Sequence, residues 1–203
     1  MRVLLTGFAA FPGCPDNPTQ RVVEHFRSGG GGLASHQVVA EILPVEYQRV
    51  ELAFADLLDS VQPDIALSLG AGRHRQTLRL ESQGVNLDNA SIPDNSGEIR
   101  SNVPIINAGP PFLTNRLDLS ALLTEFTESR LIAEISRSAG SYVCNHLLYF
   151  ATYLQQIRQL PFEFLFIHVP TEENGFSLDQ TVQGIYTVVN WLASLPRTPE
   201  EGH

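Results

Sequence analysis

Short apolar runs alternate along this chain with longer segments in which apolar residues recur at helical spacing. Val3 to Thr6 is predicted as the first strand, and the apolar runs Ile65 to Leu69 and Phe162 to Ile167 are typical of strands buried on both faces. A helix is predicted before Pro63 from five apolar residues that share one face: Val50, Phe54, Leu57, Leu58 and Val61. This alternation predicts an α/β protein with a mainly parallel sheet.

Local signals mark where several elements begin. Asn17 followed by Pro18 is typical of a helix N-cap and first helical position, because both residue types suit unpaired N–H groups. Ser177 and Gln180 form a capping-box pattern before the last predicted helix. The residues from 77 to 87 alternate between apolar and polar, which is typical of a hairpin outside the main sheet.

Composition narrows the class of protein. The chain has 203 residues, a net charge of −9 and 43% hydrophobic residues. We expect a single domain over residues 1–203, with 196–203 as a frayed tail. The acidic balance disfavours a nucleic-acid partner, and no apolar run reaches the roughly 18 residues of a membrane span.

The two cysteines, Cys14 and Cys144, are too few for a disulfide framework. The first residues reach Gly7 before an apolar segment of signal-peptide length can form. We therefore expect a cytoplasmic protein in which both thiols are reduced.

Candidate chemistry lies where predicted strands end, because ligands of open α/β sheets bind at the carboxyl ends of strands. His168 directly follows the run Phe162 to Ile167, and Cys144 falls in the first turn of a predicted helix. A helix N-terminus and a nearby imidazolium both favour a thiolate, and can lower a cysteine pKa from about 8.5 to roughly 3.5–7.5. The pattern is consistent with a nucleophilic thiol and its base.

Each of these residues also has a simpler interpretation. A lone cysteine among Tyr142, Val143 and Leu147 favours inert packing, and a histidine at a strand end favours a hydrogen-bonded structural role. Glu81, in an alternating segment, is most simply a solvent-facing strand residue. Its functional interpretation is a carboxylate that orients the imidazole.

Other catalytic motifs are absent from the sequence. Gly70-Ala71-Gly72 follows a strand but lacks the third glycine of a dinucleotide site, and there is no phosphate-binding loop. Histidine and cysteine pairs at metal-ligand spacing do not occur, nor does the Gly-x-Ser-x-Gly pattern of serine hydrolases. We expect no metal and no cofactor.

Several segments, in order, resemble the type I pyroglutamyl peptidases, also called pyrrolidone carboxyl peptidases. The resemblance covers about residues 1–192, and the segment around Cys144 is its most specific part. The matching segments are Leu5-Thr6-Gly7-Phe8 with Phe11 and Asn17-Pro18; Glu81 with Asn86 and Ile92-Pro93-Asp94-Asn95; Ala139-Gly140-Ser141-Tyr142-Val143-Cys144-Asn145-His146; and Phe166-Ile167-His168-Val169-Pro170.

The resemblance implies a three-layer α/β/α domain with a mixed, mainly parallel twisted sheet, related in architecture to purine nucleoside phosphorylases. It also implies a cysteine peptidase in which Cys144 is the nucleophile, His168 the general base and acid, and Glu81 the orienting carboxylate. Members of this family remove an N-terminal pyroglutamyl residue from peptides, need no metal, and commonly form homotetramers in the cytosol.

The substrate of that family suits the residue types of this chain. A pyroglutamyl terminus is a neutral lactam, so its pocket needs apolar walls and a few hydrogen bonds. In the family the equivalents of Phe8 and Phe11 pack on the lactam ring and that of Asn17 lies near it, while Tyr142 and Val143 can add further wall. Without the resemblance, Phe8 and Phe11 would be interpreted as covering the sheet edge.

One departure leaves alternatives open. Ser91 stands where most members have an arginine, and the segment Gly70-Ala71-Gly72-Arg73 differs from the longer glycine-rich form of the family. Activity could be weakened, the protein could be a ligand-binding descendant, or Arg73, Arg75 or Arg79 could replace the missing cation. A nucleoside phosphorylase-like enzyme is a further alternative, disfavoured because it needs no thiolate at a helix start.

Overall fold

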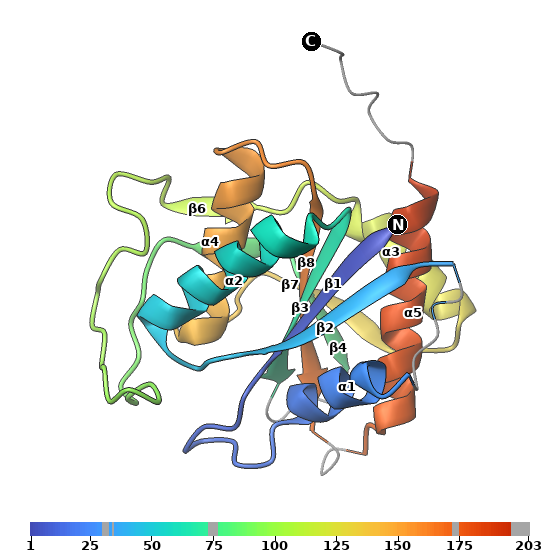
Figure 1. Cartoon of the computed structure of the whole chain (residues 1–203), viewed down its shortest axis with the longest axis horizontal. Helices are drawn as coiled ribbons and strands as arrows, with labels where there is room; N and C mark the ends of the chain where they lie inside the picture. Colours follow the sequence, from blue (N-terminus) through green and yellow to red (C-terminus); the bar gives the residue numbers. More distant parts are fainter. Residues whose placement is uncertain (30–32, 34, 73–76, 172–174, 196–203) are drawn as a thin grey trace.

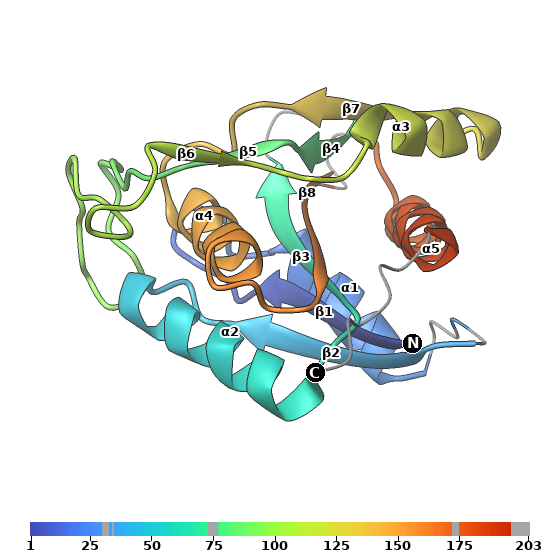
Figure 2. The same ribbon diagram turned by 90° about the horizontal axis from the view of Figure 1, so that it is seen from above.

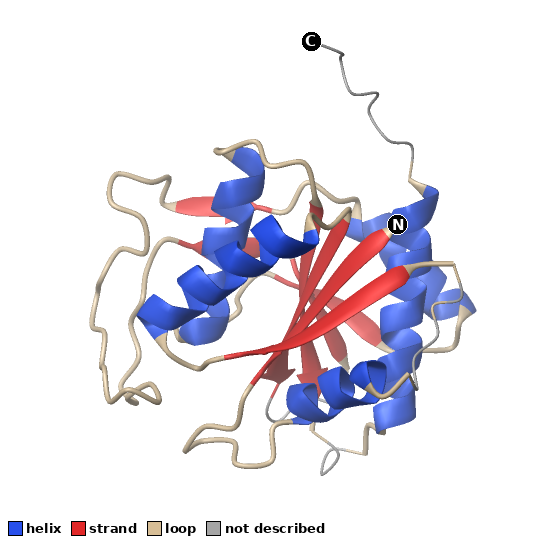
Figure 3. Ribbon diagram, in the orientation of Figure 1, coloured by secondary structure: helices blue, strands red, loops and turns tan. Residues whose placement is uncertain are grey.

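Strands and helices alternate along most of the chain, as the apolar pattern predicts (Figure 3). The computed structural model describes residues 1–29, 33, 35–72, 77–171 and 175–195, so the predicted tail at 196–203 lies outside the described residues. The strands are β1 (Arg2–Phe8), β2 (Gln37–Leu43), β3 (Ile65–Gly72), β4 (Leu78–Glu81), β5 (Gln83–Val85), β6 (Phe112–Thr114), β7 (Ala133–Ser136) and β8 (Glu163–Pro170). The helices are α1 (Pro18–Arg27), α2 (Tyr47–Val61), α3 (Leu119–Glu128), α4 (Val143–Gln156) and α5 (Leu178–Ser194).

Six strands form one twisted sheet in the order β2-β1-β3-β8-β4-β7 (Figure 1). The first four strands of this order are parallel neighbours. β4 pairs antiparallel with β8 and parallel with β7, so the last two strands run the opposite way. The predicted mixed, mainly parallel sheet is therefore confirmed.

Helices cover both faces of the sheet and bury two separate apolar cores (Figure 2). One core contains buried residues of α1, α3 and α5, and the other contains those of α2 and α4. Consecutive strand residues point to opposite faces, so β8 contributes Leu165 and Ile167 to the first core and Phe164 and Phe166 to the second. These are the three layers that the resemblance implies.

The helix starts follow their local sequence signals. The side chain of Asn17 accepts a hydrogen bond from the Thr19 N–H at the start of α1, and Pro18 is the first helical residue. Ser177 and Gln180 form the reciprocal bonds of a capping box at the start of α5. Both predicted starts are confirmed.

The predicted hairpin at 77–87 is wrong. β4 joins the main sheet, whereas β5 pairs with β6 in a separate two-stranded sheet that packs against α4. The residues alternate because Leu78 and Leu80 point into the core with α3 and α5, which is the pattern of any strand with two unlike faces. Glu81 therefore lies in the main sheet, beside β8.

Candidate active site

The predicted catalytic histidine lies at the carboxyl ends of parallel strands. β1 ends at Phe8, and Gly70 of β3 pairs with His168 of β8 in the sheet register. This edge of the sheet is where α/β proteins bind ligands, because loops and helix starts converge there. The site is therefore at the position in the fold that the sequence predicts.

Glu81 reaches His168 because β4 is antiparallel to β8. Arg79 is the register partner of His168, so Glu81, two residues further along β4, lies diagonally opposite on the same face. Glu81 Oε1 is 2.8 Å from His168 Nδ1, and the Glu81 side chain is fully buried. The simpler interpretation of Glu81 as a solvent-facing strand residue is thus wrong.

A glycine leaves room for the imidazole on the neighbouring strand. A Cβ atom at Gly70 would lie 2.8 Å from His168 Cδ2 and 2.9 Å from Phe166 Cε1. Real Cβ atoms do not approach that closely, so any larger residue would displace the ring. The observed position of the His168 ring therefore requires a glycine at residue 70. This packing requirement accounts for Gly70, which belongs to no dinucleotide-binding motif.

Cys144 is the second residue of α4 and is half-buried. The Cys144 thiol and the Glu81 carboxylate both raise the pKa of His168, which places the two groups beside the same imidazole. The N-cap residue Tyr142 makes no side-chain cap hydrogen bond. Backbone N–H groups of the first helical turn, which have no partner within a helix, are therefore not occupied by a cap side chain.

The environment of His168 favours its charged form. Burial lowers the pKa of His168, but the hydrogen bonds and negative charges of Cys144 and Glu81 outweigh it and raise the pKa to about 9. The imidazole is therefore protonated at neutral pH. Such a group can donate a proton to a leaving group that develops negative charge.

The five residues predicted to bind substrate lie together around one pocket beside Cys144. Sequence reasoning missed two further wall residues, Val45 and Ala71, although Ala71 follows the predicted strand Ile65 to Leu69 and lies near the carboxyl end of β3, where such residues are expected. None of these described lining residues carries a charged side chain. The lining consists of Phe8, Phe11, Asn17, Val45, Ala71, Tyr142, Val143 and Cys144.

Contacts between the walls define the shape of the pocket. The rings of Phe11 and Tyr142 lie with centroids 5.9 Å apart, and Phe8 packs on Phe166 at 6.4 Å. The Asn17 side chain caps α1 and also donates a hydrogen bond to the Ala9 carbonyl at 3.0 Å. Asn17 therefore holds the loop that carries Phe11.

The other residues singled out from the sequence lie away from this pocket. Ser91 is exposed and is not among the lining residues. Arg79 lies 3.8 Å from Glu81 Oε1 and also contacts Glu134, while Arg73 and Arg75 lie outside the described residues. Cys14 is buried in the Phe11 loop, with its sulfur 3.7 Å from the Asp16 carbonyl oxygen.

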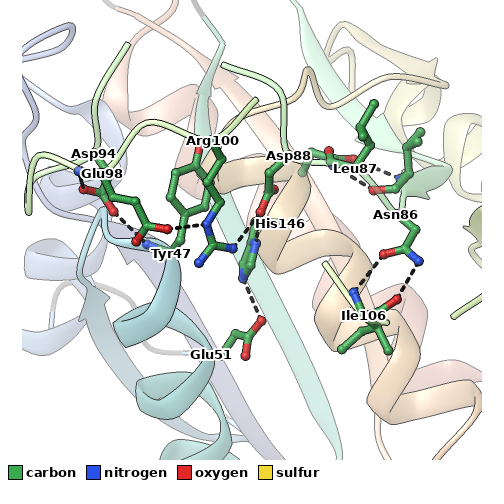
Figure 4. A network of polar contacts seen from close by, with 12 residues as sticks. Tyr47, Glu51, Asn86, Leu87, Asp88, Asp94, Glu98, Arg100, Ile106 and His146 are labelled. Atoms are coloured by element: carbon green, nitrogen blue, oxygen red, sulfur yellow. Dashed lines mark hydrogen bonds and ion pairs between the residues drawn. The ribbon is translucent and has the colours of Figure 1, made fainter. Parts of the chain in front are cut away.

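A second charged cluster near the start of α4 was not predicted (Figure 4). His146 Nδ1 lies 2.8 Å from Asp88 Oδ2, and His146 Nε2 lies 2.9 Å from Glu51 Oε1. Arg100 donates to the same Asp88 oxygen at 2.9 Å. These residues come from three distant segments, so no local signal in the sequence relates them. Among the described residues, no group of three or more metal-capable side chains could hold a metal ion.

The chain is similar in sequence and structure to known peptidases. The family model described as pyroglutamyl peptidase matches residues 1–185. A pyrrolidone-carboxylate peptidase of Yersinia pestis is 36% identical over 172 residues, covering 83% of this chain and 78% of the relative. The structure of pyrrolidone carboxyl peptidase from Pyrococcus furiosus superposes with a TM-score of 0.87 at 27% identity, covering 95% of this chain and 98% of that chain. The corresponding enzyme of Fervidobacterium islandicum gives 0.86 at 27% identity, with the same coverage.

The three-layer α/β fold and these similarities define a hydrolase of the cysteine peptidase class. More specifically, the chain belongs to the pyroglutamyl peptidase family.

Proposed function

We propose that this enzyme removes an N-terminal pyroglutamyl residue from peptides through a thioester on Cys144. The observation that carries the proposal is the position of the thiol. Cys144 lines a pocket without charged side chains and lies beside a histidine whose Nδ1 is bonded to a buried carboxylate. This arrangement supports nucleophilic acyl transfer.

The pocket fits the chemistry of a lactam ring. A pyroglutamyl terminus has no free amine, so no counter-charge is needed, and Phe8, Phe11 and Val143 offer apolar surface for the ring. A charged N-terminal amine would lose its hydration there without a carboxylate to replace it. The pocket therefore favours a blocked N-terminus over a free one.

In the first half of the proposed reaction, the Cys144 thiolate, whose proton is on His168, attacks the carbonyl carbon that joins pyroglutamate to the next residue. Backbone N–H groups at the start of α4 stabilise the tetrahedral oxyanion. The C–N bond then breaks, and His168 protonates the departing amine. The products of this half-reaction are the shortened peptide and a thioester between pyroglutamate and Cys144.

In the second half, His168 accepts a proton from water as the water attacks the thioester. The C–S bond breaks, pyroglutamate leaves and Cys144 is regenerated. Glu81 acts throughout by its bond to His168 Nδ1, which keeps the opposite ring nitrogen available for the sulfur and for water. The step needs no metal or cofactor to balance.

A comparison of two fluorogenic substrates tests this function. We expect the purified enzyme to release aminomethylcoumarin from the pyroglutamyl derivative with a kcat/KM about 100-fold or more above that for the prolyl derivative. The two rings have similar size, but prolyl carries a charged amine and lacks the lactam carbonyl. Equal values, or no release from the pyroglutamyl derivative, would contradict the proposal.

The family resemblance makes two further predictions that concern the whole protein. A homotetrameric assembly and a cytoplasmic location stay predictions. Among the described residues, no helix is long and apolar enough to cross a membrane.

A further inference from the structure

The segment between β5 and β6 contains an irregular hairpin, residues 88–103. Asp88 and Val103 exchange two backbone hydrogen bonds at its base, of 2.8 and 3.0 Å. The Ala90 N–H bonds the Arg100 carbonyl at 2.9 Å, and the Asp94 N–H bonds the Glu98 carbonyl at 2.9 Å nearer its tip. We call this segment the 88–103 hairpin.

The 88–103 hairpin is bonded to three walls of the pocket from outside. The Tyr142 hydroxyl donates to the Pro93 carbonyl at 3.0 Å. The Asn95 backbone N–H donates to the Val45 carbonyl at 2.9 Å, and the Asn95 side chain donates to the Ala10 carbonyl at 3.0 Å. Residues of the hairpin are not among those described as lining the pocket. The hairpin therefore sets the spacing of the walls without touching the substrate.

Arg100 joins the two arms of this hairpin and packs against Tyr47 of α2. Its Nη1 donates to Asp88 at 2.9 Å and its Nε to Glu98 at 2.7 Å, so one guanidinium joins both arms. The guanidinium also lies over the Tyr47 ring, 4.5 Å from the centroid. Figure 4 shows Arg100 between Asp88, Glu98 and the Tyr47 ring. The Arg100 side chain is only 14% exposed, so these contacts are shielded from water.

Two contacts connect Arg100 to the pocket. The Tyr47 ring beneath the guanidinium meets the Tyr142 ring edge-on, with centroids 5.8 Å apart. Asp88, fully buried, shares its Oδ2 between Arg100 and His146 of α4. Burial raises the pKa of Tyr142 to about 12, so its hydroxyl keeps the proton that it donates to the hairpin.

We propose that Arg100 is a positioning residue for substrate binding: by joining the two arms of the 88–103 hairpin through Asp88 and packing on Tyr47, it holds the Tyr142, Val45 and Phe11-loop walls at the spacing the pyroglutamyl ring requires. This inference rests on the proposed function. The assignment is to the binding step, because the bonds described for Glu81 and His168 involve no residue of the hairpin.

The split between KM and kcat separates this role from a merely structural one. For Arg100→Met we expect KM for pyroglutamyl aminomethylcoumarin to rise about tenfold, with kcat per reactive Cys144 thiol within about twofold of the parent. Simple loss of folded enzyme would lower kcat and leave KM unchanged. The KM of Arg100→Lys should lie between those of the parent and Arg100→Met, because the lysine ammonium still reaches one carboxylate but lacks the guanidinium fork.

A matched control makes the same chemical change elsewhere. Arg49 pairs only with Glu46 among the described ion pairs, and its side chain is 69% exposed, so Arg49→Met should leave both KM and kcat at parent values. If Arg100→Met gave the KM of the parent enzyme, the proposal would be overturned.

A second variant keeps the test valid if Arg100→Met folds poorly because Asp88 loses one of its cations. Asp88→Asn combined with Arg100→Met removes both charges while an amide oxygen remains for His146. We expect the double variant to recover thermal stability but to keep the raised KM. A return of KM to the parent value together with stability would show a structural role only and refute the proposal.

The proposed function and this inference fail in distinguishable ways. An inactive parent enzyme would refute the function itself. Titration calorimetry of a pyroglutamyl dipeptide with Cys144→Ala and with Cys144→Ala/Arg100→Met tests the wall spacing independently of turnover. We expect about tenfold weaker binding in the double variant, and equal affinity would overturn the inference.

Discussion

At the scale of single residues, the proposed reaction depends on the imidazole of His168, which lies between the Cys144 thiol and the Glu81 carboxylate. Glu81 and Cys144 together raise the pKa of His168 to about 9, against the effect of burial. This makes the charged imidazole the form present at neutral pH. The proposed role of His168 as proton donor to the leaving amine therefore predicts how activity changes with pH.

Glu81→Gln should shift the alkaline limit of activity. In the parent, kcat/KM should fall as pH rises through about 9, where His168 loses its proton. Without the carboxylate charge the pKa of His168 moves down toward its ordinary value of about 6.5, so the same fall should occur at lower pH. The measurement is the pH profile of kcat/KM for pyroglutamyl aminomethylcoumarin.

Glu134→Gln is the control for this profile, because Glu134 is a half-exposed carboxylate that contacts Arg79 and has no bond to His168. Its alkaline limit should match that of the parent. An unchanged limit in Glu81→Gln would show that Glu81 does not set the protonation of His168.

At the scale of elements, α4 carries the proposed nucleophile and, beside it, a side chain that bonds the helix to β5. Asn145, next to Cys144, accepts from the Val85 N–H at 2.9 Å and donates to the Val85 and Leu87 carbonyls at 2.9 and 3.0 Å. The Asn145 side chain thus continues the role of a strand partner for β5. The close approach of the two elements is possible because Gly84 faces the α4 backbone at Tyr149.

Asn145→Ala should destabilise the protein by about 2–4 kcal/mol, because it leaves three backbone groups without their buried partner. Urea unfolding measures this loss. Asn190→Ala, at an exposed position of α5, is the control and should change stability by less than about 0.5 kcal/mol. Equal losses in the two variants would show that the Asn145 bonds contribute no stability.

Local sequence signals predicted where the helices begin. The positions of residues that depend on pairing between distant strands could not be predicted in the same way. Asn17 and Ser177 mark helix starts through hydrogen bonds made within a few residues, and Pro18 through its fixed backbone angle, so the local sequence is sufficient. Glu81 was harder, because its burial depends on β4 lying antiparallel beside β8, a strand far along the chain. The alternation of apolar and polar residues over the four positions of β4 does not indicate which strand β4 pairs with.

At the scale of the whole molecule, the fold brings together parts of the site that the sequence keeps apart. The sequence predicted Cys144 and His168 from their places after strand and turn, and the structure joins them through side chains of α4 and β8. The cluster of Glu51, Asp88 and His146 could not be predicted, because ion pairs between distant segments leave no periodic pattern. Arg100 was not predicted for the same reason. Its backbone carbonyl accepts a hydrogen bond from the N–H of Ala90, the residue that precedes Ser91.

The overall architecture also distinguishes the two thiols. Both cysteines lie near the carboxyl ends of the strands, but Cys14 is buried in a loop with its sulfur toward a backbone carbonyl oxygen, whereas Cys144 lies at a helix start beside His168. Only the second arrangement provides a base and oxyanion-stabilising N–H groups. Of the two thiols, we therefore propose that Cys144 is the nucleophile and that Cys14 takes no part in the reaction.

The test is to measure turnover of pyroglutamyl aminomethylcoumarin by Cys144→Ala and by Cys14→Ala. Circular dichroism checks that both variants are folded. The account predicts that Cys144→Ala loses activity by about 1,000-fold or more, since the nucleophile is gone, while Cys14→Ala stays within about twofold of the parent. Parent-level turnover by folded Cys144→Ala would contradict it.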